Sequence, residues 1–137
     1  MSLGLTLSNP MNIRASGEVW NGEHRPSRNP AFKEFVDFAH GIRAGAKLLM
    51  NYQLLHGDRT LTDLIIRFAP PHENDTAKYI EHVSAWAQVP ALDRINLIGN
   101  EPLLLRIVTA MCRQETGYTD SATIAAGVHL AVQSVKA

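Results

Sequence analysis

Cysteine is almost absent from this chain of 137 residues, in which Cys112 is the single one. An intrachain disulfide is therefore excluded, and the fold does not depend on an oxidising compartment. Reactive cysteines are usually stabilised as thiolates at helix N-termini, whereas Cys112 lies near the end of an expected helix. We therefore expect Cys112 to fill space in the core.

Long apolar runs and an excess of one charge sign are also missing. No apolar stretch approaches the roughly 18 residues that a membrane-spanning helix needs, so we expect no membrane span. Residues 1–7 lack the basic and long apolar segments of a signal peptide. Thirteen Lys and Arg residues balance thirteen Asp and Glu residues, so non-specific nucleic-acid binding is not favoured and we expect no nucleic-acid partner.

Metal-binding and cofactor-binding motifs are missing as well. The histidines are far apart in the sequence, at His24, His40, His56, His72, His82 and His129. They form neither a His-x-x-x-His pair nor a His-Glu-x-x-His helix, so we expect no metal and no cofactor. Gly-x-Ser-x-Gly, Gly-x-Gly-x-x-Gly and P-loop sequences do not occur, which removes the usual support for hydrolase-fold, dinucleotide-binding and P-loop proteins.

Length and composition indicate one globular domain. Apolar residues make up 45% of the chain, and we expect a single domain over residues 1–137, with disorder of residues 1–7 left open. Residues 8–39 are rich in Asn, Pro, Gly and Ser. They predict loop with at most a small hairpin, in which Val19-Trp20 forms a short strand.

Apolar residues recur with helical spacing through the rest of the chain. Gly57 and Pro70-Pro71 are stop signals, Thr60 can cap the start of a helix, and Pro102 suits the first turn of a helix. The first expected helix covers residues 40–56, and the second runs from Thr60 to the Pro70-Pro71 stop. The third begins at Asn74, Asp75 or Thr76. The fourth runs from about Pro102 to Glu115, and the fifth runs from Asp120 or Ser121 to Val135. The predicted fold class is mainly α (α+β), with a loop-rich or small β region near the N-terminus.

Glu115 is the first candidate for chemistry. Ile107, Met111 and Glu115 follow one another at intervals of four, so the carboxyl group continues the apolar face of its helix. Gly117 suits a left-handed helix end, which puts Glu115 in the last turn, where the helix dipole disfavours an anion. Burial and the dipole both favour the protonated form that a general acid needs. The alternative is a frayed glutamate whose side chain reaches water.

A second candidate region covers residues 68–80, in which two prolines precede the polar start of a helix. Tyr79 either offers its hydroxyl to a cleft or is a core tyrosine whose hydroxyl reaches the surface. Glu73 either favours the helix N-terminus electrostatically or serves as a second candidate acid.

Three segments resemble parts of the lysozyme superfamily that cleaves peptidoglycan, which includes lytic transglycosylases, goose-type lysozymes and flagellar glucosaminidases. Residues 114–117 read Gln-Glu-Thr-Gly, like the end of the catalytic helix in that superfamily. Residues 9–23 resemble its Asn-Pro turn and small β region, and Tyr79-Ile80 resembles its cleft-lining tyrosine. In this chain the segment that contains Glu115 comes last, whereas in the superfamily it comes first. A circular permutation explains this order, and proteins tolerate such a permutation when their termini lie close together at the surface. Residues 8–130 also resemble small phage and prophage proteins, both virion proteins and muralytic enzymes.

The resemblance implies cleavage of the β-1,4 bond between N-acetylmuramic acid and N-acetylglucosamine. Glu115 and Tyr79 are then the expected catalytic residues, and the nucleophile is either water or the muramyl 6-hydroxyl. The expected substrate-binding residues are Asn12, Arg14, Glu73 and Asn74. The candidates for a second carboxylate are Glu18, Glu23 and Asp75.

The resemblance also implies partners and a location. We expect a monomer that binds glycan strands and other virion proteins, located in a phage virion or the host cytoplasm and acting in the periplasm or cell wall. Two alternatives remain open. One is a peptidoglycan endopeptidase or amidase, and the other is a non-catalytic phage structural protein.

Overall fold

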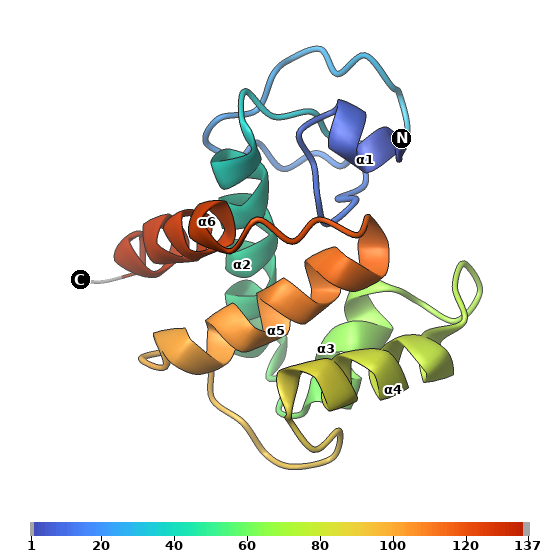
Figure 1. Ribbon diagram of the computed structural model, residues 1–137, viewed down its shortest axis with the longest axis vertical. Coiled ribbons are helices and arrows are strands. Elements are labelled where there is room, and N and C mark those ends of the chain that lie inside the picture. Colours follow the sequence, from blue (N-terminus) through green and yellow to red (C-terminus); the bar gives the residue numbers. More distant parts are fainter. Residues whose placement is uncertain (1, 136–137) are drawn as a thin grey trace.

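The computed structural model describes residues 2–135, which form a mainly helical domain as predicted (Figure 1). A long loop region over residues 7–37 lies above the helices in this view and covers one end of them. The helices are α1 (Leu3–Thr6), α2 (Phe38–His56), α3 (Leu61–Phe68), α4 (Thr76–Ala87), α5 (Glu101–Glu115) and α6 (Ser121–Gln133). None of the helices in residues 2–135 combines the length and the apolarity needed to cross a membrane.

Side-chain caps fix where most of these helices begin. Thr60 and Asp63 form a reciprocal capping box at the start of α3, because each side chain accepts a hydrogen bond from the other residue's backbone N–H. Asp75 caps α4 and Asp120 caps α6, both at predicted starts. The start of α2 was predicted at residue 40, but Asp37 caps the helix and it begins two residues earlier, at Phe38.

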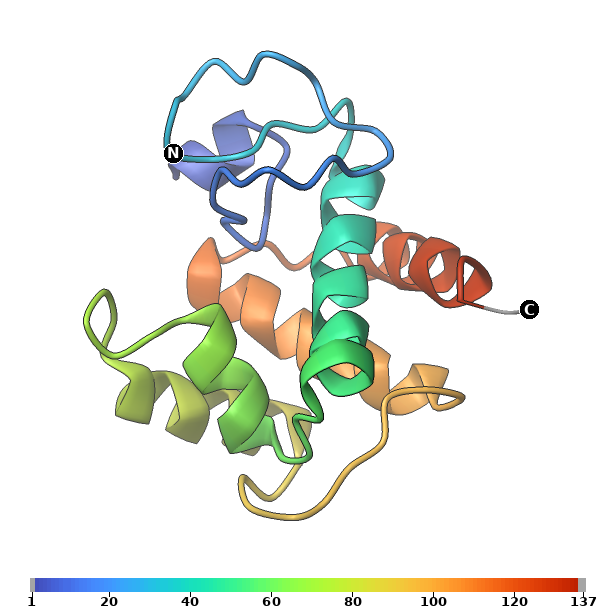
Figure 2. The same cartoon turned by 180° about the vertical axis from the view of Figure 1, so that it is seen from behind.

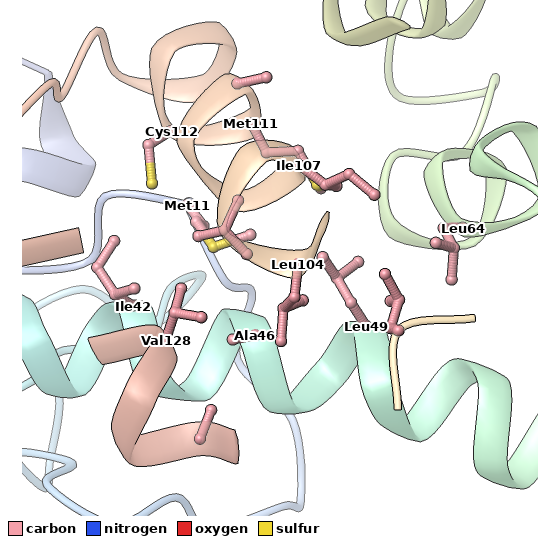
Figure 3. Close-up of a cluster of buried hydrophobic side chains, with 14 of the residues drawn as sticks. Met11, Ile42, Ala46, Leu49, Leu64, Leu104, Ile107, Met111, Cys112 and Val128 are labelled. Carbon is pink, nitrogen blue, oxygen red and sulfur yellow. The ribbon is translucent and has the colours of Figure 1, made fainter. Parts of the chain in front are cut away.

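The core lies where α2 crosses α5 and α6. Helix α2 packs mainly against α6, and α5 packs against both α4 and α6. Figure 3 shows the side chains that fill this crossing, among them Ile42, Ala46 and Leu49 from α2 and Leu104, Ile107 and Met111 from α5. Cys112 is fully buried beside them, which confirms its prediction as a core residue.

The disorder left open for residues 1–7 is wrong for the described residues among them. Leu3–Thr6 forms the short helix α1, and Leu7 directly after it is buried in the protein. The Asn9 backbone N–H donates to the Gly4 carbonyl at 2.7 Å, so the chain folds back on the helix. Four residues are too few to show a helical period in the sequence. Residue 1 lies outside the described residues.

The strand predicted at Val19-Trp20 is wrong within residues 2–135. The loop region contains two isolated bridges instead, between Arg14 and Phe32 and between Glu23 and Phe35. Polar side chains hold this region together. The buried Asn9 amide donates to the Ile13 and Lys33 carbonyls, at 3.0 and 2.9 Å.

A buried ion pair between Lys33 and Glu23 holds the middle of the same loop region. The Lys33 ammonium lies 2.9 Å from the Glu23 carboxylate and also donates to the Ser16 and Glu18 carbonyls. The Glu23 carboxylate in turn accepts from the Trp20 backbone N–H at 3.0 Å. Because these buried charges satisfy one another and nearby backbone groups, the loop keeps one conformation without a sheet.

Gly41 on α2 allows the N-terminal loop to approach the helix closely. A Cβ atom at this position would collide with the Ser8 backbone carbonyl and come within 3.0 Å of Pro10. Since a backbone carbonyl cannot rotate away as a flexible side chain does, the loop would have to move. The loop that carries Asn12 is thus seated on α2 through a glycine.

Gly41→Ala is expected to destabilise the protein by about 1–3 kcal/mol, as overpacked buried sites generally do. Thermal unfolding should show a Tm lower by roughly 4–10 °C. Gly17→Ala is the matched control, because an added Cβ at Gly17 meets nothing within 4 Å among the described residues. An unchanged Tm for Gly41→Ala would show that the loop is not seated on α2 as described.

Candidate active site

A cleft of about 420 Å³ separates the N-terminal loop region from the end of α3 and the α3–α4 loop. One wall is formed by residues 12–20 and Phe32, and the other by the end of α3 and the α3–α4 loop. Residues of α2 and the end of α5 also line it. Figure 2 shows the N-terminal loops above and α3 and α4 below, with α5 ending between them.

Glu115 is the last residue of α5 and lies in this cleft with both carboxylate oxygens engaged. The Tyr79 hydroxyl donates to Oε2 at 2.8 Å. The Asn12 amide donates to Oε1 at 3.1 Å and to the Glu115 backbone carbonyl at 3.2 Å. The alternative of a frayed glutamate in water is therefore wrong.

The pKa of Glu115 is raised above its ordinary value of 4.5, chiefly because the carboxyl group is buried. Hydrogen bonds from Tyr79 and Asn12 and the positive charge of Arg14 oppose this rise. Burial prevails, and the position at the C-terminal end of α5 disfavours the anion further. The site thus holds a proton more firmly than an exposed glutamate does, yet provides donors for the carboxylate once the proton has left.

Local backbone geometry explains why the N-terminal loop meets the end of α5. Gly117 has φ +76°, the left-handed conformation predicted for it, and its N–H donates to the Cys112 and Arg113 carbonyls. Asn12 also has a positive φ of +52°, which asparagine tolerates better than most residues. The Thr116 hydroxyl then donates to the Pro10 carbonyl at 2.8 Å.

Gly4 on α1 leaves space for the contact between the N-terminal loop and the end of α5. A Cβ atom at Gly4 would collide with the Asn12 side-chain oxygen and lie within 2.8 Å of Thr116. Helix α1 therefore backs the residue that holds Glu115, and a glycine is required for the approach. No local pattern predicts this support, because Thr116 is more than a hundred positions from Gly4 and Asn12 in the chain.

Tyr79 reaches Glu115 from α4 with its ring in the core. Tyr79 is only 3% exposed, and its hydroxyl donates to the Glu115 carboxylate, so the hydroxyl does not reach the surface. Tyr79 itself is not among the residues that line the cleft. Burial, and then the neighbouring Glu115, raise the pKa of Tyr79 well above 10. The hydroxyl consequently stays neutral and acts as a hydrogen-bond donor.

The structure brings all four predicted substrate-binding residues to the cleft. Arg14 and Glu73 come from opposite walls and form an ion pair with Nε 3.3 Å from Oε2. The Arg14 guanidinium also lies over the Phe32 ring at 5.2 Å. The Asn74 amide donates to the Pro70 carbonyl at 3.3 Å, which stabilises the turn before α4. Asn12 is the only one of the four that contacts Glu115 directly among the described residues.

The three candidates for a second carboxylate have different environments. Glu18 is exposed and lines the cleft. Glu23 is buried in the ion pair with Lys33, and Asp75 caps α4 with its carboxylate. Glu23 and Asp75 are therefore occupied with holding the fold, which leaves Glu18 as the candidate that faces the cleft.

The cleft is also lined by residues that were not predicted as site residues, among them Trp20, Phe32, Tyr52 and Arg67. Arg67 is held by the buried Asp58 carboxylate through two hydrogen bonds, of 2.8 and 3.1 Å, and its guanidinium lies 5.6 Å from the centre of the Tyr52 ring. These residues come from separate elements that only the folded chain brings together. No local motif marks them.

Neither a cluster of metal ligands nor an activated thiol is found among residues 2–135. Residues 2–135 contain no group of three or more His, Cys, Asp or Glu side chains close enough to hold a metal ion. Burial, and then the nearby Glu115 charge, raise the pKa of the Cys112 thiol far above its ordinary value. The chemical group that the cleft presents is thus a carboxyl with a raised pKa.

These features define a class: a mainly helical protein with a partly buried carboxyl group in an open cleft. No family model matches the sequence. The chain is 36% identical over 117 residues to Protein P5 of Pseudoalteromonas phage PM2, an alignment that covers 83% of this chain and 71% of the phage protein. The chain belongs to the family of this bacteriophage protein.

Glu115→Gln is expected to change how stability depends on pH. Because the folded-state pKa of Glu115 is raised, its contribution to stability is fully present below about pH 4.5 and is lost as the pH rises through the folded-state pKa. The amide variant has no such loss. Its Tm relative to wild type should therefore rise by a few degrees between pH 4 and pH 7, in thermal unfolding followed by circular dichroism.

The matched control for this comparison is Glu81→Gln, which alters an exposed carboxylate on α4. It should show no comparable rise between the two pH values. A Tm difference for Glu115→Gln that falls with pH would mean that the folded protein favours the ionised form.

Tyr79→Phe is expected to raise the pKa of Glu115 further. The variant removes a hydrogen bond that stabilises the carboxylate and keeps the buried ring. Carbon NMR of labelled glutamate carboxyl groups follows this titration directly. Tyr118→Phe is the control, because Tyr118 stacks on Phe38 at 4.7 Å instead of contacting Glu115. A lower or unchanged pKa would show that the Tyr79 hydroxyl does not stabilise the anion.

Proposed function

We propose that this protein is a peptidoglycan glycosidase in which Glu115 is the single catalytic acid. The observation that carries the proposal is the partly buried Glu115 carboxyl, with its raised pKa and its two donors, facing an open cleft. A general acid must be protonated near the working pH and must also tolerate losing its proton. Burial supplies the first property, and Tyr79 and Asn12 supply the second.

The substrate class is inferred from the resemblance of residues 114–117 to the catalytic helix end of the lysozyme superfamily. Three features support a circularly permuted lysozyme-like domain. These are the mainly helical fold, a glutamate at a helix end, and the contact of that glutamate with the Asn-Pro loop and with a helix-borne tyrosine. We propose the β-1,4 bond between N-acetylmuramic acid and N-acetylglucosamine as the bond that is cleaved.

In the proposed mechanism, Glu115 donates its proton to the glycosidic oxygen as the bond to the sugar C1 breaks. Tyr79 and Asn12 then hold the resulting carboxylate in place through the hydrogen bonds already formed. Glu115 next acts as a base and takes a proton from the attacking oxygen, which restores the starting state. The attacking oxygen belongs either to water or to the muramyl 6-hydroxyl.

The role of a second carboxylate falls to Glu18 in this proposal, because it is exposed to the cleft. If Glu18 instead of Glu115 took the proton of the attacking water, the reaction would invert the anomeric centre, whereas help from the substrate acetamido group would make Glu18 dispensable and leave Glu115 as the base. Arg14 suits the carboxylate of a peptide stem. Its partner Glu73 lies on the opposite wall, and an anionic substrate group would replace Glu73 in this pair.

Membership in a bacteriophage protein family supports a role in a phage particle or in an infected host. We propose that the protein acts on the cell wall from one of these locations, with other virion proteins as partners. The name of the phage relative describes no activity, so the alternatives are separated by experiment. A peptidase or amidase would cut the stem, and a structural protein would bind sacculi without releasing products.

Digestion of purified sacculi by wild type and Glu115→Gln tests the proposal. The amide keeps the shape of the side chain but has no proton to transfer, so activity should fall by about a hundredfold or more. Mass spectrometry of the products should find anhydromuramyl ends or reducing muramic ends. Glu81→Gln, on an exposed face of α4, should digest at the wild-type rate.

Three results would contradict the proposal. If Glu115→Gln digested sacculi at the wild-type rate, Glu115 would not be the catalytic acid. Products with free stem amines and intact glycan strands would identify a peptidase or amidase, and binding without soluble products would identify a structural protein.

A further inference from the structure

A second groove lies on the side of α5 that faces away from Glu115. Helices α4 and α5 pack side by side (Figure 1), and the groove runs between Trp86 of α4 and the face of α5 that carries Arg106 and Arg113. We call it the α4–α5 groove. It has a volume of about 350 Å³ and shares no lining residue with the cleft. Arg106 precedes Glu115 by about two and a half helical turns, so the two side chains leave α5 on opposite faces.

Two arginines in this groove have no acidic partner within residues 2–135. Arg106 and Arg113 are separated by about two helical turns, so they leave the same face of α5 roughly 10 Å apart. Both are exposed, and neither belongs to any ion pair in the described part of the chain. The lining of the groove contains no carboxylate. Asp120, next to the lining residue Thr119, caps α6 with its side chain. The groove therefore concentrates positive charge in a chain without net charge.

Both guanidinium groups are held from one side. Arg106 Nε donates at 3.0 Å to the carbonyl of Ala87, the last residue of α4. The Arg113 guanidinium lies over the Trp86 ring, 4.0 Å from its centre, in a cation–π contact. These contacts leave the terminal nitrogens of both groups available as donors. An arginine that is already held loses less conformational freedom when it binds a carboxylate.

Apolar side chains form the rest of the groove. Trp86 stacks on His82 with ring centres 5.3 Å apart, yet Trp86 is still 38% exposed. Leu105 and the buried Ala110 of α5 extend the apolar lining. Trp and Arg are the residue types most enriched at the energetic centres of protein interfaces. The combination of a fixed tryptophan with two unpaired arginines thus favours a protein partner.

An acidic peptide segment fits this groove better than a nucleic acid or a lipid surface. A nucleic acid needs many phosphate contacts, whereas the groove offers two cations and the chain has no excess of positive charge. A lipid surface is bound by protruding apolar side chains, whereas this site is a hollow. Two carboxylates three residues apart in an extended or polyproline II segment lie roughly 9–10 Å apart, which matches the spacing of the two arginines.

We propose that the α4–α5 groove binds an acidic segment of a protein partner. Two carboxylates of the segment pair with Arg106 and Arg113, and an apolar side chain between them packs against Trp86 and Leu105. The site goes beyond the proposed function and does not depend on it, because none of its residues lines the cleft. A partner bound there holds the protein by the face opposite Glu115 and leaves the cleft open.

Titration of the full chain with the peptide acetyl-Gly-Glu-Leu-Ala-Glu-Gly-amide tests the site by proton–nitrogen NMR. The chain has two tryptophans, so Trp86→Phe identifies the Trp86 indole signal by its loss. The Trp86 indole signal and the Arg113 Nε–H signal should shift saturably with this peptide. The same peptide with Gln in place of both Glu residues should leave them unshifted. Raising NaCl from about 0.05 M to about 0.3 M should weaken binding, because salt screens exposed charges.

Arg113→Gln should weaken binding of the acidic peptide about three- to tenfold, because it removes one of the two charge-assisted contacts. Arg94→Gln is the matched control, since Arg94 is exposed and lines neither the cleft nor the α4–α5 groove. It should bind the peptide with wild-type affinity. If Arg113→Gln does not fold, the difference between the Glu and Gln peptides on the wild-type protein decides the matter alone.

Other results overturn the site. No shift with the acidic peptide, or equal shifts with the Glu and Gln peptides, would show that the groove does not recognise carboxylates. A shift of the Asn12 side-chain amide without one at Trp86 would place the peptide in the cleft. A Trp86 shift with single-stranded DNA or phosphatidylglycerol vesicles, and none with the peptide, would assign the groove to those anions. Digestion of sacculi by Glu115→Gln is a separate measurement, so either proposal can fail while the other survives.

Discussion

The site depends on the attachment of the N-terminal loop to the C-terminal end of α5. One amide group, that of Asn12, donates to both the backbone carbonyl and the carboxylate of Glu115. A second bond, from Thr116 to the Pro10 carbonyl, fixes the loop one residue further along. The last carbonyls of a helix have no intrahelical partners, and here the loop supplies one. Without this contact, the Glu115 carboxylate would lose one of its two side-chain hydrogen-bond donors.

The electrostatics of Glu115 reflect a balance that is set by that attachment. Covering the helix end removes water from the carboxyl group, which raises its pKa. The same covering loop supplies the Asn12 donor, and α4 supplies Tyr79, both of which lower it. A site with burial alone would keep the proton but disfavour its release, whereas a site with donors alone would be ionised at neutral pH. A proton carrier needs both, and the cost is a carboxylate that destabilises the folded state at neutral pH.

The sequence predicted what short-range chemistry determines. The cap at Thr60 and the left-handed Gly117 depend on residues within a few positions of each other, and the structure has them as expected. Glu115 was found because the period of its own helix marks the buried face. The contact of Asn12 with Glu115 spans 103 positions and leaves no local pattern. Trp20 was assigned to a strand because its residue type favours one, but a buried ion pair holds that segment as a loop instead.

For this site, the order of its segments along the chain matters less than how the folded segments contact one another. Its groups come from the N-terminal loop, from the α3–α4 region and from the end of α5, and each of these is positioned by its own local contacts. The ion pair between Arg14 and Glu73 joins the two walls at an exposed position, where such pairs generally contribute only ~0–1 kcal/mol. The walls therefore depend mainly on the loop seated at Gly41 and on the Asn12 contact, and the exposed pair can open to a ligand at little cost. An arrangement of this kind keeps Glu115 fixed, because its own contacts do not change when the ion pair between the two walls of the cleft opens.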